Sequence, residues 1–504
     1  MAERGGADGS FLRKAGPLVV ARFIGAVTTL VIPLVLARAM DLEDYGIYKQ
    51  LFLIAYTLYH VLPFGVVQSL YFFIPRTEQP RPWVAQTLVF TLVAGTCGGA
   101  LLLGVAPFLA HALSSPELLR YQWPLALYVM AVVGAMPLEV ILTGQGKTRA
   151  AAGLYLVSDV LRAAAMIVPV LLGYGLYGAM IATALFSLVR LFATWAAMLI
   201  ATRGPLFQRG LAWRQLVYAA PFGAAILLSV PQQTAHQYAV GSVVPPELFA
   251  IYAVGCFQLP LVDLLYTPTS EVLMVRVGEL ERMGRLKESI HAFREASARL
   301  AYAFLPMAAF LWVAAPEFIA ALFGRRFLDA VPIFRVSVVA VALSILPMDG
   351  LLRARDETRY LFFSYLVKAL VTLPAVYLGV RFFGMMGGIS SWAVAEFVGK
   401  GTLLLRVPRA LQDFDGPLLA RVARVLPWKA LGKASLAAAG AGLVVVLVRA
   451  LAPSAGDASL PEGFAWRALP LVLAAGVFGA GYVALLRVAG VRPFSVLAAF
   501  RRNP

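Results

Sequence analysis

Charged residues and cysteines are scarce in this chain of 504 residues. Asp, Glu, Lys and Arg make up 14% of it, whereas soluble domains contain about 25%. This deficit excludes an ordinary soluble globular protein. The two cysteines, Cys97 and Cys256, lie inside apolar runs and match no metal-ligand spacing, so no metal site is predicted.

Apolar residues are abundant instead, at 61% of the chain. Apolar runs of about 20 residues, the length that crosses ~30 Å of hydrocarbon, recur from end to end. The sequence therefore predicts an all-α polytopic membrane protein with about fourteen transmembrane helices. The expected spans lie near residues 16–38, 51–74, 84–109, 121–143, 150–172, 176–201, 215–239, 248–270, 299–323, 331–352, 360–380, 385–405, 430–450 and 468–487.

Basic residues are distributed unevenly between the predicted loops. With the N-terminus in the cytoplasm, the inner segments hold most of them, including the clusters at residues 276–299 and 406–433. The positive-inside rule then places both termini in the cytoplasm. We attribute the net charge of +17 mainly to the basic residues of the inner loops, which orient the chain and attract anionic lipid. Nucleic-acid binding is not expected, because the basic residues are spread over many loops.

An internal repeat organises the chain. Residues 137–191, shifted by 210 positions, meet residues 347–401 without a gap, with Pro137 on Pro347 and Gly178 on Gly388. A weaker match pairs the first span with the seventh. We therefore expect two six-helix lobes of like orientation, related by a two-fold axis along the membrane normal, a design typical of transporters. The lobes are residues 1–201 and 202–405. Residues 406–504 add a cytoplasmic linker, spans 13 and 14 and a short cytoplasmic tail.

Charged side chains within spans are the candidate functional residues, because each costs roughly 2.5–3.5 kcal/mol at the centre of a lipid-facing helix. Arg22, Arg190 and Lys368 have no opposite charge at helical spacing. A cationic cavity is the favoured interpretation, and pairing across helices is the alternative. Arg190 and Lys400 occupy the same repeat position. Facing each other across the seam between the lobes, they would suit a multivalent anion such as pyrophosphate.

Local pairing is an alternative for other charges. Arg162, a further candidate for the cavity, lies three residues after Asp159, and Lys400 lies four residues after Glu396. Each pair shares a helix face and can neutralise itself.

Two acids are candidates for coupling to H+ or Na+, the only cofactor-like species expected. Asp263 lies mid-span between Pro260 and Pro268. Glu139 lies near an inner helix end, where water is expected to reach it, and a structural role is its alternative.

Two segments resemble a known family. Ala-Arg-Ala-Met-Asp-Leu-Glu-Asp-Tyr-Gly-Ile-Tyr at residues 37–48 and Gly-Leu-Leu-Arg-Ala-Arg-Asp-Glu-Thr-Arg at residues 350–359 resemble bacterial polysaccharide flippases. These Wzx-type proteins belong to the multidrug/oligosaccharidyl-lipid/polysaccharide exporter superfamily. The resemblance implies a V-shaped pair of lobes in the bacterial inner membrane that carries an undecaprenyl-pyrophosphate-linked sugar to the outer leaflet, for lipopolysaccharide or exopolysaccharide. It also implies ion-gradient coupling and cavity arginines, which Arg22 and Arg190 match best by position.

Several alternatives remain open at this point. Fourteen spans also fit the lipid II flippase branch, whose extra helix pair is associated with the lipid tail. A cation-coupled drug or metabolite antiporter is disfavoured, because a cationic cavity attracts anions. A membrane glycosyltransferase or polymerase usually needs a substantial outer loop, and the acids of Asp413-Phe414-Asp415 face the cytoplasm. We expect a non-enzymatic, alternating-access flippase in the bilayer, with a polysaccharide polymerase complex as a candidate partner.

Overall fold

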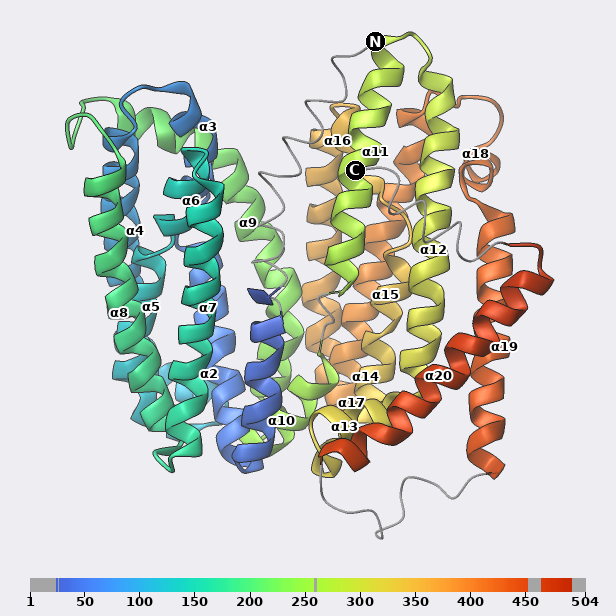
Figure 1. Ribbon diagram of the computed structural model, residues 1–504, viewed down its shortest axis with the longest axis horizontal. Coiled ribbons are helices and arrows are strands. Elements are labelled where there is room, and N and C mark those ends of the chain that lie inside the picture. Colours follow the sequence, from blue (N-terminus) through green and yellow to red (C-terminus); the bar gives the residue numbers. More distant parts are fainter. Residues whose placement is uncertain (1–23, 26, 258–260, 452–463, 492–504) are drawn as a thin grey trace. The chain divides into compact units, whose positions relative to one another are not determined.

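The computed structural model describes residues 24–25, 27–257, 261–451 and 464–491, and within these ranges the regular structure is helical, without strands (Figure 1). The all-α prediction is therefore confirmed. The chain divides into two compact units, Met1–Ala250 and Ile251–Pro504.

The first unit contains a helix at Val27–Ala39 followed by α2 (Leu42–Val61), α3 (Val66–Phe73), α4 (Arg81–Ala112), α5 (Gln122–Gly134), α6 (Pro137–Gly144), α7 (Thr148–Leu171), α8 (Gly175–Ala201) and α9 (Leu211–Gly241). The helix α10 (Pro246–Gly255) crosses the boundary. The second unit contains α11 (Leu261–Arg282), α12 (Ser289–Val313), α13 (Ala315–Leu322), α14 (Val331–Ser337), α15 (Val339–Leu343), α16 (Met348–Ala354), α17 (Thr358–Ala410), α18 (Leu418–Val425), α19 (Trp428–Leu451) and α20 (Phe464–Val488).

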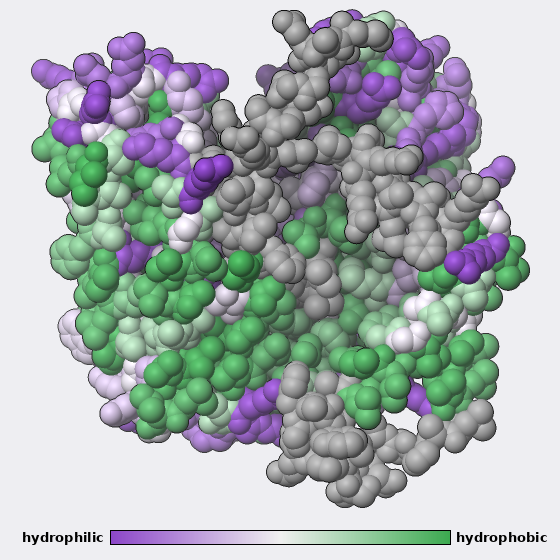
Figure 2. All heavy atoms as spheres, viewed as in Figure 1, coloured by the Kyte–Doolittle hydropathy of each residue, from purple (hydrophilic) through white to green (hydrophobic). Residues whose placement is uncertain are grey.

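Ten helices in the described ranges are long and apolar enough to cross a membrane, or eleven if the bent pair Leu42–Val61 and Val66–Arg76 forms one span. The chain is thus a multi-pass membrane protein. Figure 2 shows hydrophobic residues over the sides of the helices and hydrophilic residues gathered at the end of the first unit where α3 leads into α4. Such extensive exposed apolar surface fits contact with lipid. The count of fourteen spans stays a prediction.

The longest helix, α17, contains two crossings. Its 53 residues would extend about 80 Å as one straight helix, far more than the ~30 Å of a bilayer core. Gly384, at φ 56° and ψ −140°, interrupts it in a conformation that is open essentially only to glycine. The hydroxyls of Ser364 and Thr402 lie 2.5 Å apart, which is possible only if the two halves run side by side. The predicted spans near 360–380 and 385–405 are therefore the two arms of a helical hairpin.

The first unit is held together by an apolar cluster and a buried amide. The cluster joins α3, α4, α6 and α8, and within it Phe73 stacks on Trp83 with ring centroids 4.0 Å apart. From α9, the Gln215 side chain donates to the hydroxyls of Ser69 at 2.9 Å and Thr87 at 2.7 Å. Because buried polar groups need partners, Gln215 fixes the position of α9 against α3 and α4.

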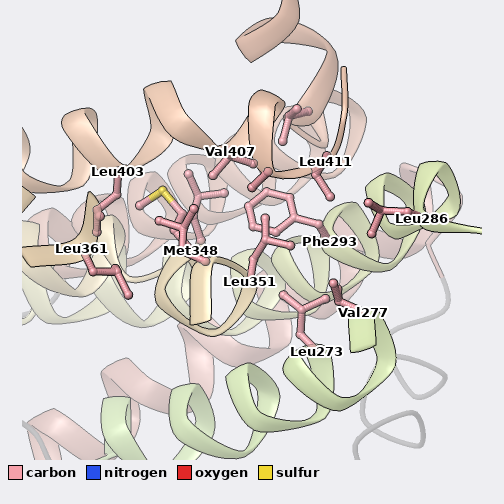
Figure 3. Close-up of a cluster of buried hydrophobic side chains, with 14 residues drawn as sticks. Leu273, Val277, Leu286, Phe293, Met348, Leu351, Leu361, Leu403, Val407 and Leu411 are labelled. Atoms are coloured by element: carbon pink, nitrogen blue, oxygen red, sulfur yellow. The ribbon is translucent and has the colours of Figure 1, made fainter. Parts of the chain in front are cut away.

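The second unit has a core at the junction of α11, α12, α16 and α17. Phe293 of α12 is fully buried there among Leu351 of α16 and Val407 of α17 (Figure 3). Leu273 and Val277 contribute the apolar face of α11. This packing fixes the short helix α16 against α17, and α16 carries one of the acids discussed below.

The turns of the two units match at the repeat offset. Gly146, between α6 and α7, has φ +74°, and Asp356, 210 positions later between α16 and α17, has φ +53°. Ser114 at φ +48° and Gly324 at φ +106° form a second such pair, and a 3-10 helix follows each: Pro116–Tyr121 and Arg325–Ala330. These shared left-handed residues support the repeat and extend the correspondence upstream of residue 137.

Side chains in the matching turns also make equivalent hydrogen bonds to the end of a neighbouring helix. The Gln145 amide donates to the carbonyl of Ala201 at 2.7 Å, at the end of α8. Its repeat equivalent, Arg355, donates to the carbonyl of Ala410 at 3.0 Å, at the end of α17. Both contacts satisfy carbonyls that a helix end leaves free.

The compact units do not follow the predicted lobe boundary. The helix α9, which the sequence assigns to the second lobe, packs on α2, α3 and α4 within the first unit. The Tyr238 hydroxyl of α9 lies 2.8 Å from that of Thr57 in α2. A division by compactness and a division by repeat are different criteria. The ranges 1–201, 202–405 and 406–504 therefore stay a prediction about the repeat.

Replacing Arg81 by alanine should destabilise the first unit. The Arg81 guanidinium, at the start of α4, donates to the carbonyls of Leu199 at 3.0 Å, Thr202 at 2.5 Å and Gly204 at 3.2 Å. It therefore closes the carboxyl end of α8, where the helix dipole favours a cation. We expect Arg81→Ala to cost about 2 kcal/mol, measured as reduced thermal stability in detergent. Arg149→Ala, at an exposed position, is the control, and equal melting of both variants would contradict this role.

Candidate functional site

A buried ion pair joins α6 and α8 in the first unit. Arg190 of α8 contacts the carboxylate of Glu139, and the two side chains are 18% and 6% exposed. Glu139 lies in the first turn of α6, where free backbone N–H groups favour an anion. Contrary to expectation, Glu139 is buried, because α6 packs against α3, α7 and α8. Arg190 therefore pairs with an acid on another helix. This is the alternative that the sequence offered to a cation without a partner.

A second pair lies on α7. The Arg162 guanidinium is 3.2 Å from the carboxylate of Asp159, and it also donates to the Thr29 hydroxyl at 2.9 Å. The local pairing expected from their spacing is therefore present. Tyr59 of α2 lies where all four charges act on its hydroxyl. We call Glu139, Asp159, Arg162 and Arg190 the N-terminal charge cluster; its formal charge is zero.

The second unit pairs its charges across the α17 hairpin. Lys368, on the first arm, contacts the carboxylate of Glu396 on the second, and the side chains are 12% and 19% exposed. The spacing on one helix face had offered Lys400 as an alternative partner of Glu396. The structure does not show that alternative, because the hairpin brings Lys368 directly opposite Glu396. For Lys368, as for Arg190, the pairing is across helices.

Lys400 lies beside a tyrosine. Its ammonium is 5.3 Å from the centroid of the Tyr266 ring, and the Tyr266 hydroxyl donates to the carboxylate of Asp349. Asp349 lies in the first turn of α16, as Glu139 does in α6. By the repeat, Asp349 and Lys400 correspond to Glu139 and Arg190. We call Asp349, Tyr266, Lys368, Glu396 and Lys400 the C-terminal charge cluster.

The remaining predicted site residues have different outcomes. Arg22 lies outside the described residues. Asp263 does not lie inside a continuous helix: α10 ends at Gly255 and α11 begins at Leu261, so Asp263 is in the first turn of α11. Its position mid-span stays a prediction. Its side chain is exposed, and none of the described residues forms an ion pair with it. Whether Arg190 and Lys400 face each other stays a prediction, because they belong to different units.

Sequence reasoning missed Tyr266, Tyr59 and Thr29. A tyrosine or threonine in an apolar helix gives no signal of its own, since most such residues only pack or bond locally. No metal-ligand group was predicted, and the described ranges contain no cluster of His, Cys, Asp or Glu that could hold a metal ion.

Asp413, which follows the end of α17, has a structural role. Arg424 of α18 donates from Nε to one oxygen of Asp413 at 3.1 Å and from a terminal nitrogen to the other at 2.7 Å. This bidentate contact lowers the pKa of the Asp413 carboxyl below its usual range. Asp413 thus ties α18 to the end of α17.

Comparisons with known proteins show one family, by a family model, and one fold, by solved structures. A family model described as polysaccharide biosynthesis protein matches residues 35–332. No curated protein matches the sequence. The structure is similar to that of the lipid II flippase MurJ in an inward closed conformation, with a TM-score of 0.70 at 13% identity over 93% of this chain and 98% of that one.

Two further solved structures belong to the MOP superfamily. An inward-facing multidrug resistance transporter of the MATE family has a TM-score of 0.59 at 16% identity, over 80% of this chain and 96% of that one. A transporter from Pyrococcus furiosus has a TM-score of 0.55 at 14% identity, over 82% and 95%. At these identities the likeness establishes the fold of this superfamily and no more.

Arg190→Ala should strongly destabilise the first unit, because it leaves Glu139 as a buried, unpaired carboxylate. We expect a loss of about 3–5 kcal/mol. Removing both partners, in Glu139→Ala with Arg190→Ala, should cost less than the sum of the single changes, by roughly 0.5–3 kcal/mol. Thermal unfolding of the four proteins in detergent measures this coupling. Additive effects would show that the two side chains do not stabilise each other.

Proposed function

Because the chain belongs to the polysaccharide biosynthesis protein family, we propose that it is a flippase for an undecaprenyl-pyrophosphate-linked oligosaccharide. It acts in the bacterial inner membrane, with both termini in the cytoplasm, and supplies lipopolysaccharide or exopolysaccharide synthesis. The observation that carries the proposal is the Glu139–Arg190 pair, a permanent cation held inside a membrane-spanning unit by a single carboxylate.

The energetic cost of these charges supports a functional role. A buried ion pair is often no more stable than well-packed apolar side chains of similar size. The N-terminal charge cluster nevertheless contains two arginines and two acids. An arginine fork matches the geometry of phosphate oxygens and binds them in bidentate fashion. Arg190 and Arg162 therefore suit a pyrophosphate head, and each is held by an acid while the substrate is absent.

Binding in this scheme is an exchange of anions. The pyrophosphate displaces Glu139 from Arg190 and Asp159 from Arg162, so neither cation becomes unpaired. The polyprenyl tail stays in the lipid while the two lobes alternate between inward and outward access. Binding can shift this equilibrium only as far as the head prefers one state over the other. The carboxylates recover the arginines when the head leaves.

The membrane potential favours export of such a head. Moving about two negative charges outward across 100 mV, negative inside, yields roughly 4–5 kcal/mol. Coupling to H+ or Na+ would add to this drive. The protein itself need not form or break a covalent bond, so we propose a transporter and not an enzyme. A polysaccharide polymerase complex is the partner expected to consume the exported unit.

A lipid II flippase is the second candidate. It is favoured by one observation: the likeness to MurJ covers 93% of this chain, whereas the likeness to the MATE transporter covers 80%. Helices α19 and α20 pack on α12 and α13, and Arg449 of α19 contacts Glu317 of α13. A drug or metabolite antiporter is less suited, because arginine cations favour an anionic substrate.

Deleting the gene should leave a complete lipid-linked oligosaccharide on the inner leaflet, and restoring the gene should return it to the outer leaflet. Lipid extraction with a sidedness assay measures this. The combined change Glu139→Gln with Arg190→Gln keeps the site neutral without a guanidinium, so we expect normal expression and at least tenfold less flipping. Arg149→Ala is the matched control.

Other outcomes of this experiment have distinct meanings. Lipid II build-up with lysis would assign the protein to the second candidate. Full flipping by the combined variant would remove the N-terminal charge cluster from the binding site. No change in any lipid-linked intermediate would contradict the flippase proposal itself.

A further inference from the structure

The two units carry different cations at the same repeat position, Arg190 in the first and Lys400 in the second. An arginine stays protonated in proteins, whereas a lysine readily gives up its proton when it is removed from water. The cations of the N-terminal charge cluster are both arginines, and those of the C-terminal charge cluster are both lysines. The second cluster alone can therefore change the charge of its cations.

The geometry around Lys400 separates it from its acid. Arg190 touches Glu139 directly, but among the described residues no carboxylate lies within ion-pair distance of the Lys400 ammonium. The Tyr266 ring occupies that place, with Lys400 against its face and Asp349 accepting from its hydroxyl. A cation–π contact holds an ammonium more weakly than a direct buried ion pair does. Lys400 is thus the less firmly charged member of its repeat position.

The other charges of the C-terminal charge cluster sum to one negative charge, which a proton on Lys400 neutralises. On the α17 hairpin, Lys368 and Glu396 neutralise each other. From α16, Asp349 faces Lys400, while Arg353, 59% exposed and 3.9 Å from Asp349, is screened by water. Tyr266 of α11 and Tyr365 of α17 are phenols, and α15 has no ionisable residue. Arg335 of α14 lies against Trp312, with its guanidinium 5.0 Å from the ring centroid, and donates to the Trp312 carbonyl.

Protonation of Lys400 therefore sets the net charge of the cluster. With Lys400 protonated, Asp349 is balanced and the cluster is neutral. With the amine neutral, the cluster carries one negative charge, which is costly wherever water is excluded. The cluster passes through an occluded state more easily with the proton bound.

We propose that Lys400 is the proton carrier of the transport cycle, with Asp349 and Tyr266 as its positioning residues. This rests on the proposed function, in which export of the lipid-linked head is the work that the proton drives. The neutral amine accepts a proton from water on the outer side, forming one N–H bond, and returns it to water on the cytoplasmic side. Asp263 and Glu139, the acids expected from sequence, are not required for this step.

The test measures protons exchanged when the full-length protein, in lipid nanodiscs, binds undecaprenyl pyrophosphate. Calorimetry in two buffers of different ionisation enthalpy gives that number. For the wild type we expect about one proton exchanged per lipid bound. Lys400→Arg keeps the positive charge but cannot release a proton, so proton exchange should vanish while the Kd changes less than about threefold. Lys433→Arg, whose ammonium donates to the Ala489 carbonyl at 2.6 Å, is the matched control and should behave as the wild type.

Two further measurements keep the inference testable. If Lys400→Arg does not fold, Lys400→Gln replaces it: glutamine binds no proton, so proton exchange should vanish there too. Nuclear magnetic resonance of 15N-labelled lysine side chains, without any ligand, should show one ammonium that titrates over the physiological pH range. That signal should be absent from the Lys400 variant, and Tyr266→Phe should shift its midpoint by removing the hydroxyl that reaches Asp349.

The outcomes separate this inference from the proposed function. Equal proton exchange by the wild type and the folded Lys400 variant would overturn the role of Lys400 even if the lipid binds. The absence of lipid binding in every protein would contradict the proposed substrate, and the titration would then decide on Lys400 alone. A titration without any lysine signal in that range would overturn the inference.

Discussion

The pairing of charges across helices is the constraint on which the rest of the structure depends. An unpaired charge in a lipid-facing helix is costly, so each cation in a membrane-spanning helix needs a nearby acid or an aromatic face. Glu139 supplies it for Arg190, Glu396 for Lys368, and the Tyr266 ring for Lys400. The helix breaks serve this purpose. The breaks before α6 and α16 place Glu139 and Asp349 in first turns, where free N–H groups favour an anion.

The repeat gives the two units one scaffold with different chemistry. Matching left-handed turns at Gly146 and Asp356 set the same connection between a short acid-bearing helix and a long one. On that scaffold the first unit holds arginine against an acid, which suits a fixed anion site. The second unit holds lysine against a tyrosine, which suits a group that changes charge. A single transporter can then combine binding of the head with coupling to a proton.

Much of the fold could be predicted from the sequence, because hydrocarbon thickness fixes the length of apolar runs. The helical class, the hairpin formed by α17 and the local Asp159–Arg162 pair are examples. The prediction failed where partners lie on different helices. Glu396 pairs with Lys368 and not with Lys400. The helix break that places Asp263 in the first turn of α11 was not predicted either.

The sequence by itself determined that this is a helical membrane protein of the polysaccharide exporter type, and which positions carry charge at membrane depth. Apolar run length, loop charge and a fixed repeat offset are properties of the chain alone. Only the tertiary structure decided which charges meet. Helical spacing relates residues three or four apart, whereas the contacts of Arg190 with Glu139 and of Tyr266 with Asp349 depend on how separate helices are packed and turned.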